Sequence, residues 1–203
     1  MIIAVDGPAA AGKGTIARAL AAHFGYHFLD TGTLYRRVGL AVLKSGGDTS
    51  RAPEIAKNLE TFEFADAQLR TEDVSAMASI VAVIPEVRAA LLAFQREFAA
   101  RSPGSVLDGR DIGTVVCPEA QVKLYVTASP EVRARRRYEE LKSLGKTVSL
   151  AATRDDIRIR DERDSNRAVA PLLPATDAKI IDTSDMTIEA AIAECIRLVE
   201  LAG

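Results

Sequence analysis

The chain has 203 residues, enough for one substantial core or a core with small attached lobes, and its 48% hydrophobic and 27% charged residues are typical of a globular protein. Its 26 basic residues are balanced by 28 acidic ones, and the net charge of −2 argues against a nucleic-acid or membrane-surface binder. The two cysteines lie far apart and argue against a disulfide framework, which favours a reducing compartment. The first residues are predicted to form a strand that leads directly into a glycine-rich turn, which is not the pattern of a signal peptide. No apolar run reaches the roughly 18 residues of a membrane span. We therefore expect a cytoplasmic protein.

The first motif is a glycine-rich turn between a strand and a helix. Residues 2–5 are typical of a strand and residues 16–24 of a helix. Glycines between them allow backbone N–H groups to point into one hollow, to which the helix dipole adds positive potential. The alternative, a turn rich in glycine and alanine with a surface lysine, explains less of this agreement between strand, spacing, lysine and helix. The residues predicted to bind nucleotide phosphates, which the resemblance described below assigns to ATP, are Gly7, Pro8, Ala9, Ala10, Ala11, Gly12, Lys13, Gly14 and Thr15.

Two side chains of this motif are assigned to chemistry. Lys13 is expected on an exposed loop, from which its charge reaches the terminal phosphates of a nucleotide, and it is the first candidate catalytic residue. The strict pattern places a hydroxyl directly after the lysine, whereas here Gly14 follows and the hydroxyl comes at Thr15. We expect Thr15 to serve a hydrated Mg²⁺ that accompanies ATP.

Short apolar strands alternate with helices along the rest of the chain. The predicted strands cover residues 26–29, 61–64, 105–107, 122–126 and 179–181. The predicted helices cover residues 34–44, 53–59, 74–84 and 86–100, a segment capped by Ser129, and a last segment that starts at Thr187. Alternation without short hairpin turns predicts an α/β fold, with a parallel sheet covered by helices on both faces.

Polar segments follow three of the predicted strands. They are residues 7–15, 30–36 and 108–111, and in a parallel sheet the ends of these strands meet at one edge, so we expect one cleft there. Asp108 ends its strand as a Walker-B-type aspartate does, and we expect it to hold Mg²⁺ through water. The alternative is an aspartate that only caps a loop.

Basic side chains gather in residues 133–167, which hold eleven of the 26 lysines and arginines. They could form a solvated surface laced with ion pairs, which contributes little to stability. The presence of a phosphate loop favours the other interpretation, in which arginines stabilise charge during phosphoryl transfer. If this segment is helical, Arg160, Arg163 and Arg167 share one face.

Four blocks of sequence resemble one known family. They are Gly12-Lys13-Gly14-Thr15, Asp30-Thr31-Gly32 with Tyr35-Arg36, residues 108–116 and residues 163–172. Together these blocks resemble the bacterial cytidylate kinases, within the nucleoside monophosphate kinases. They occur in the family's order and span nearly the whole chain, whereas the phosphate loop alone does not distinguish CMP from other acceptors.

The resemblance implies one domain over residues 1–203, with a P-loop NTPase core, a small lid near residues 133–167 and an NMP-binding lobe near residues 45–90. It implies transfer of the γ-phosphate of ATP to CMP, and to dCMP, giving CDP or dCDP and ADP in pyrimidine metabolism. Mg²⁺ is the implied cofactor, the nucleotides are the partners, and a monomer is expected. Residues 62–71 lack the hairpin-forming stretch that the family usually carries, so a trimmed acceptor lobe is expected.

The resemblance also implies the roles of individual residues. The acceptor phosphate is surrounded by Thr31, Arg36, Arg110 and Arg167, cytosine is faced by Ser79, Arg88 and Asp111, and the ribose is approached by Arg160 and Asp164. The implied catalytic residues, which neutralise the charge that moves, are Lys13, Arg110, Arg160 and Arg163.

Two alternative functions stay open from the residues themselves. One is another small-molecule kinase on the same scaffold, which a panel of acceptors distinguishes. The other is a nucleotide-dependent switch protein, which would need a guanine-reading Asn-Lys-x-Asp motif that the sequence lacks. Nucleic-acid binding by the arginine-rich segment is disfavoured by its interspersed acidic residues.

Overall fold

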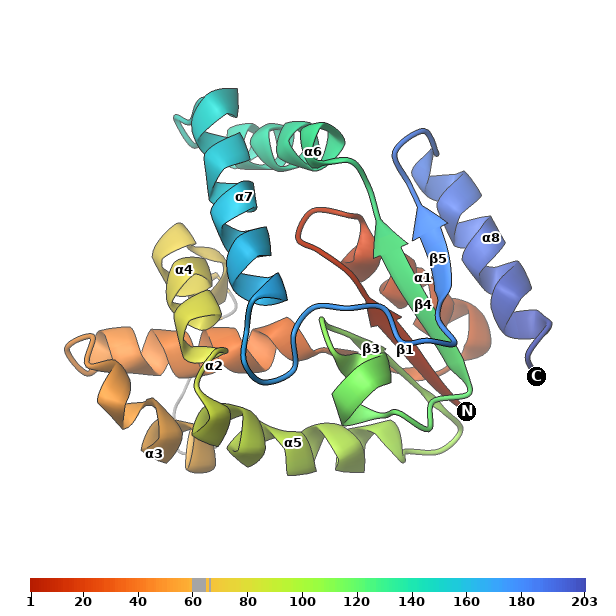
Figure 1. Ribbon diagram of the computed structural model, residues 1–203, viewed down its shortest axis with the longest axis horizontal. Coiled ribbons are helices and arrows are strands. Elements are labelled where there is room, and N and C mark those ends of the chain that lie inside the picture. Colours follow the sequence, from red (N-terminus) through yellow and green to blue (C-terminus); the bar gives the residue numbers. More distant parts are fainter. Residues whose placement is uncertain (60–64, 66) are drawn as a thin grey trace. The chain divides into compact units, whose positions relative to one another are not determined.

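A five-stranded sheet carries the phosphate loop. The computed structural model describes residues 1–59, 65 and 67–203. The sheet order is β2-β3-β1-β4-β5, and β1 pairs in parallel with β3 and β4, as β4 does with β5 (Figure 1). The strands are β1 (Ile2–Asp6), β2 (His27–Asp30), β3 (Ser105–Asp108), β4 (Val122–Thr127) and β5 (Lys179–Asp182). The predicted α/β fold is confirmed, and β1 lies at the centre of the sheet, so the loop after it is flanked by the ends of β3 and β4.

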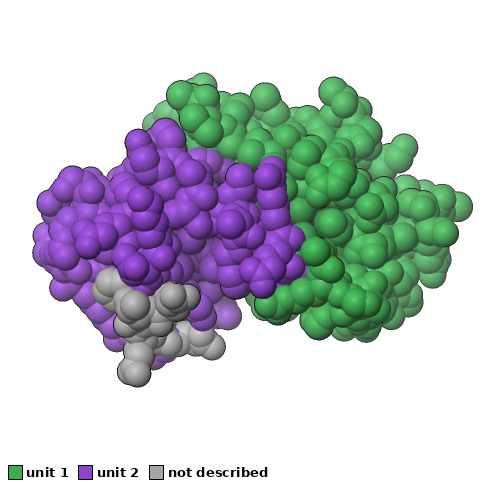
Figure 2. Space-filling view, turned by 90° about the horizontal axis from the view of Figure 1, so that it is seen from below, with its two compact units in different colours: residues 1–29, 99–203 green, residues 30–98 purple. Residues whose placement is uncertain are grey.

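The chain forms two compact units, coloured separately in Figure 2. Unit 1 comprises Met1–Leu29 and Ala99–Gly203 and holds the sheet, and unit 2 comprises Asp30–Phe98. The helices of unit 1 are α1 (Lys13–Phe24), α6 (Pro130–Ser143), α7 (Leu150–Ser165) and α8 (Ile188–Glu200). The helices that the structure describes in unit 2 are α2 (Thr31–Lys44), α3 (Ala52–Lys57), α4 (Glu72–Val81) and α5 (Pro85–Ala99), whose last residue belongs to unit 1.

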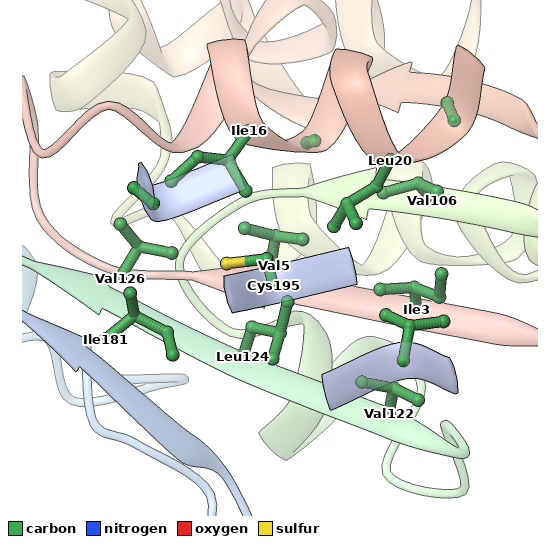
Figure 3. Packing of buried hydrophobic residues seen from close by; sticks show 14 of the residues in the cluster. Ile3, Val5, Ile16, Leu20, Val106, Val122, Leu124, Val126, Ile181 and Cys195 are labelled. Atoms are coloured by element: carbon green, nitrogen blue, oxygen red, sulfur yellow. The ribbon is translucent and has the colours of Figure 1, made fainter. Parts of the chain in front are cut away.

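The core of unit 1 is packed between the sheet and two helices. Alternate strand residues such as Ile3, Val5 and Leu124 point to the face covered by α1 and α8 and contact Ile16 and Leu20 (Figure 3). These five side chains are no more than 1% exposed, and burying one such side chain contributes about 1.5–3 kcal/mol. Because the phosphate loop joins β1 to α1, both of its ends are fixed by this core.

Both cysteines of the chain are buried free thiols. Cys117 lies just after a π-helical turn over Ile112–Val116, and Cys195 lies on α8 in the core of unit 1 (Figure 3). Both are 0% exposed, and burial raises the pKa of the Cys195 thiol to about 12. Neither thiol is therefore set up for reaction.

Unit 2 has its own helical core. The predicted apolar face of α2, with Leu34, Val38, Ala41 and Val42, is buried against residues of α3, α4 and α5. Among the helices described, none is alone long and apolar enough to cross a membrane. Only α4 and α5 together reach that length and composition, and they are bent by 98°.

Several predicted element boundaries were wrong, and side-chain capping explains one of them. Helix α2 starts at Thr31 rather than residue 34, directly after β2, so its first turn includes residues expected in a loop. Helix α4 starts at Glu72 rather than residue 74 because the Thr71 hydroxyl accepts a hydrogen bond from Val74 N and caps it. Helix α3 ends at Lys57, two residues earlier than expected. The strand predicted over residues 61–64, and part of the 62–71 stretch, lie outside the described residues.

Candidate active site

The phosphate loop passes close over the end of β4. Gly7 has φ 142°, and a Cβ there would lie 1.9 Å from the Val126 carbonyl oxygen, so a side chain cannot be accommodated. Ala10 adopts the left-handed conformation at φ 59°, and Gly12 precedes the first turn of α1. The loop thus leads directly into the N-terminus of α1, whose free N–H groups and dipole suit an anionic phosphate.

Lys13 is buried rather than exposed, which corrects the prediction. It is 6% exposed, its Nζ donates to the Pro8 carbonyl oxygen at 3.2 Å, and Nζ lies 3.7 Å from Asp108 Oδ1. The register of β1 and β3 places Asp108 beside the loop, where the lysine folds back over it. Burial lowers the pKa of Lys13 to about 8, with Arg110 adding to the shift and Asp108 opposing it. A desolvated cation of this kind favours an anionic ligand.

Asp108 and Thr15 offer oxygen ligands of the type that Mg²⁺ prefers. Asp108 is 8% exposed at the end of β3, and Thr15 is exposed in the first turn of α1. A Cβ on Gly14 would lie 3.3 Å from Asp108 Oδ2, so a larger residue at that position would crowd the carboxylate. One carboxylate and one hydroxyl fit the usual mode of Mg²⁺, which keeps several waters and binds phosphate oxygens.

Asp6, which the sequence analysis missed, holds the turn after β3. Its carboxylate accepts hydrogen bonds from Ile112 N at 2.8 Å and Gly113 N at 2.7 Å. Burial raises the pKa of Asp6 to about 6 against the effect of these two donors, and the neighbouring charge of Asp111 adds to the rise. Asp111, a predicted cytosine ligand, is 5% exposed at the start of the turn that Asp6 fixes.

Several predicted acceptor residues of unit 1 gather around Asp164. Arg110 Nε donates to Asp164 Oδ2 at 3.0 Å, and Arg167 Nε donates to the Asp164 carbonyl oxygen at 3.2 Å. Burial alone would raise the pKa of Asp164, but the charges of Arg110, Arg160 and Arg167 outweigh it and hold this pKa below the ordinary value of 3.8. The charge of Arg160 also acts on Lys13, so this cluster borders the phosphate loop.

The helical face expected for the arginines of α7 is only partly formed. Helix α7 ends at Ser165, so Arg167 lies beyond it and does not continue the face that Arg160 and Arg163 were expected to share with it. Arg163 is half-buried on α7, and its catalytic role stays a prediction.

The arginines of the basic segment fall into different environments. The pairs Arg137–Glu140 and Arg158–Glu162 are surface ion pairs, as the less specific interpretation expected. Arg133 is different, since it is 4% exposed and connects three parts of unit 1. It donates to the carbonyl oxygens of Ala128 at 2.9 Å and Ala9 at 3.3 Å, and its Nη2 lies 2.7 Å from Asp161 Oδ2 on α7.

A hollow of about 460 Å³ opens beside the phosphate loop. Its walls are mostly apolar and come from the loop, α6, the residues after β5 and the start of α8, with Arg136 and Glu140 as the charged groups on α6. Arg136 Nη1 donates to Thr183 Oγ1 at 2.9 Å, and its Nη2 donates to the Thr183 carbonyl oxygen at 2.7 Å. The residues that line the hollow are Ala10, Ala11, Gly12, Thr15, Arg136, Glu140, Thr183, Met186, Thr187, Ile188 and Ala191.

Unit 2 carries the remaining predicted acceptor residues. Thr31 is 4% exposed at the start of α2, and Arg36 Nη1 lies 3.9 Å from Asp30 Oδ2. Arg88 is 8% exposed, donates to the Ala82 carbonyl oxygen at 3.3 Å and stacks 5.7 Å from the Tyr35 ring centroid. Ser79 is 6% exposed on α4. Their roles toward CMP stay predictions.

The sequence analysis missed one residue that a local signal could have revealed and three that no local signal marks. Asp6 directly precedes the glycine-rich loop, so its position was a usable signal. No sequence motif singles out Arg133, Arg136 or Thr183. The hydrogen bond between Arg136 and Thr183 joins residues 47 positions apart, and the one between Arg133 and Ala9 joins residues 124 positions apart. Only the fold brings them to the loop.

The chain is similar to known proteins along its whole length. A family model described as cytidylate kinase matches residues 3–201. A cytidylate kinase of Methylocella silvestris is 55% identical over 205 residues, covering 100% of this chain and 95% of the relative. A cytidylate kinase of Bradyrhizobium sp. is 53% identical over 203 residues, covering 98% of this chain and 96% of the relative. A solved structure, an uncharacterized protein from Eubacterium ventriosum, has a TM-score of 0.57 at 14% identity over 98% of both chains, which concerns the fold alone.

Proposed function

We propose a role for each part of the site on the premise that this chain belongs to the cytidylate kinase family. The chain is an ATP-dependent nucleoside monophosphate kinase, and it transfers the γ-phosphate of ATP to CMP, giving CDP and ADP. The observation that carries the residue assignments is the buried Lys13, which lies between the phosphate loop and Asp108 at the ends of adjacent strands. That arrangement supports a site for a nucleoside triphosphate with its metal.

The donor nucleotide is assigned to unit 1. The loop from Gly7 to Thr15 would hold the phosphates, and the apolar hollow bordered by Arg136 would take the adenine base, which its volume and lining support. Mg²⁺, held by Asp108 and Thr15 through water, would neutralise phosphate charge. Lys13 would stabilise the negative charge that develops on the γ-phosphate.

The acceptor residues keep the roles that the resemblance implies. In unit 1, Arg110 and Arg167 would bind the phosphate of CMP, and Asp111 would accept from the cytosine amino group. Their clustering near Asp164 and the phosphate loop supports this assignment. The predicted ligands in unit 2 are Thr31 and Arg36 for the phosphate, and Ser79 and Arg88 for the base.

Transfer then requires no general base. A phosphate oxygen of CMP is already an anion at neutral pH, and it forms a new bond to the γ-phosphorus as the bond from that phosphorus to the β–γ bridging oxygen breaks. A lone pair of the attacking oxygen becomes the new bond, the electron pair of the broken bond goes to the bridging oxygen, and ADP leaves. Arg160 and Arg163 of α7 would stabilise the charge spread over the moving phosphoryl group, together with Arg110.

The proposal extends to three properties of the whole enzyme. It would also accept dCMP, act as a monomer without a nucleic-acid or membrane partner, and work in the cytoplasm, an address that its two free thiols favour.

A coupled ADP-release assay across nucleoside monophosphates tests this function. We expect the highest kcat/KM with CMP, activity with dCMP, and weaker use of UMP and AMP. A preference for AMP or UMP would overturn the cytosine assignment, and ATP turnover that no monophosphate stimulates would overturn the residue assignments for the acceptor.

A further inference from the structure

Thr183 joins three parts of unit 1 through one buried hydroxyl. It follows the last residue of β5 and is 3% exposed. Its Oγ1 accepts from Arg136 Nη1 at 2.9 Å and lies 3.1 Å from the carbonyl oxygens of both Ala11 and Thr127, to one of which it donates. The phosphate loop, the end of β4 and helix α6 therefore meet at this side chain.

The same residue fixes the plane of a guanidinium. Arg136 Nη2 donates to the Thr183 carbonyl oxygen at 2.7 Å while its Nη1 donates to the hydroxyl, so both arms of the fork are held by one residue. The carbonyl bond alone would leave the guanidinium free to turn about that contact. Since the fork is planar, two bonds set its orientation, and Arg136 and Thr183 both line the hollow beside the phosphate loop.

We propose that Thr183 is a positioning residue for the donor nucleotide, whose hydroxyl holds the Arg136 guanidinium beside the base hollow. This inference rests on the proposed function, because it takes the base of ATP to occupy that hollow. A guanidinium held flat against an aromatic base contributes stacking and cation–π attraction. A long side chain that must first be ordered gives up part of that gain as lost rotamer freedom.

The chain offers closely matched variants. Thr183→Val keeps the shape of the side chain and removes the oxygen, whereas Thr183→Ser keeps the oxygen and removes a methyl group. Ser184→Ala is the control, because the hydroxyl of Ser184 bonds Ser129 N and Asp182 Oδ1 and not Arg136. Arg136→Met removes the group through which Thr183 is proposed to act.

Two titrations separate the base from the phosphates. Calorimetry with MgATP and with magnesium tripolyphosphate, which lacks base and ribose, is run on each variant. We expect Thr183→Val to weaken MgATP binding roughly tenfold, the scale of one hydrogen bond to a charged group, and to weaken tripolyphosphate binding less than about threefold. Thr183→Ser and Ser184→Ala should bind both ligands as the unaltered chain does. In kinetics, KM for ATP should rise with Thr183→Val while KM for CMP stays unchanged.

The double variant tests whether Thr183 acts through Arg136. If Thr183 acts through Arg136, Thr183→Val adds less than about twofold to the ATP loss in an Arg136→Met background. Equal losses for ATP and tripolyphosphate, or full additivity in the double variant, would overturn the positioning role. If Thr183→Val does not fold, Arg136→Met alone must show the ATP-selective loss, and a failure to show it overturns the proposal. An unaltered chain that binds tripolyphosphate as tightly as MgATP would instead refute the base site in the proposed function.

Discussion

At the residue scale, the burial of Lys13 places a desolvated cation at the phosphate loop. Its ammonium is 6% exposed and lies near Asp108, so it is already desolvated before a phosphate arrives. We expect Lys13→Met to lower kcat by about 10²–10³, the usual cost of removing one preorganised group that stabilises transition-state charge. Steady-state kinetics at saturating ATP and CMP measures this loss.

Lys179→Met provides the matched control, because that lysine is exposed on β5. It should keep normal kcat and a melting temperature within a few degrees of the unaltered chain, since its side chain is exposed. A normal kcat in Lys13→Met would contradict the assignment of the phosphate loop to ATP.

Asp6 makes a predictable contribution to the pH dependence of stability. The folded chain keeps the proton of this carboxyl up to a pKa of about 6, whereas the ordinary value is 3.8. Between these values the folded state binds more protons than the unfolded state, so the Asp6 contribution to the free energy of unfolding falls as pH rises from 4 to 6 and is then constant. The shift corresponds to roughly 3 kcal/mol. The charges that act on this group are Asp111 and Lys13.

Urea unfolding of the unaltered chain and Asp6→Asn at several pH values isolates that contribution. The free energy of unfolding of the unaltered chain, relative to that of Asp6→Asn, should fall from pH 4 to pH 6 and stay constant above pH 6. A difference that is constant over this range would show that Asp6 titrates normally.

At the same scale, the strand and helix around the phosphate loop could be predicted from the sequence, whereas the side-chain contacts of the loop could not. The loop from Gly7 to Thr15 was predictable because a phosphate loop is a local pattern of strand, glycines, lysine and helix. The exposure of Lys13 was predicted wrongly because its burial depends on Asp108, 95 positions away in the chain. The hydrogen bonds from Ile112 and Gly113 to Asp6 are equally non-local, so no pattern in either segment reveals them.

At the element scale, Arg133 connects helix α7 to the phosphate loop. It is buried, bonds the Ala9 carbonyl oxygen and pairs with Asp161. We expect Arg133→Met to lower the free energy of unfolding by about 3–5 kcal/mol, because it leaves a carboxylate without its cation in a largely buried place. Chemical denaturation measures this change.

Arg137→Met is the matched comparison from the next turn of α6. The pair of Arg137 with Glu140 is exposed, with side chains 28% and 56% accessible, so its loss should cost less than about 1 kcal/mol. Equal costs for the two variants would show that Arg133 is an ordinary surface arginine.

Helix boundaries marked by a capping residue or an apolar stripe were predicted well, whereas boundaries set by tertiary packing were not. Ser129 and Pro130 marked the start of α6, and the apolar stripe marked α8. The end of α7 at Ser165 and the π-helical turn over Ile112–Val116 have no such signal, because tertiary contacts of the following residues, such as Leu172 N to the Asp164 carbonyl oxygen, decide them.

At the scale of the whole molecule, the strand order was the least predictable feature. Parallel strands and their alternation with helices follow from the pattern, but the order β2-β3-β1-β4-β5 depends on pairings between distant segments. The bounds of the two units, Met1–Leu29 with Ala99–Gly203 and Asp30–Phe98, were also not evident, since no linker composition marks residue 30 or 98.

Hydrogen exchange over the whole chain tests the proposed lid. Residues 142–147, the end of α6 and the start of its connection to α7, are exposed, whereas Arg133 pairs with Asp161 of α7. In the unliganded chain we expect fast exchange in residues 142–149 and slow exchange in β1 and β4. A bisubstrate analogue should slow exchange over residues 138–155 markedly, and either nucleotide alone only partly, because closure gains charge-assisted hydrogen bonds from both phosphate groups. Full protection without ligand, or none with the analogue, would contradict a lid.

The burial of both thiols makes the chain suited to site-specific fluorescent labelling. Cys117 and Cys195 are 0% exposed, and maleimide dyes react with accessible thiolates, so neither native cysteine needs to be replaced. A single cysteine introduced at Leu144, which is 60% exposed at the tip between α6 and α7, would be the one site to take up dye in the folded chain. Emission from that dye would report nucleotide-driven movement of the tip in real time, in an otherwise unaltered enzyme.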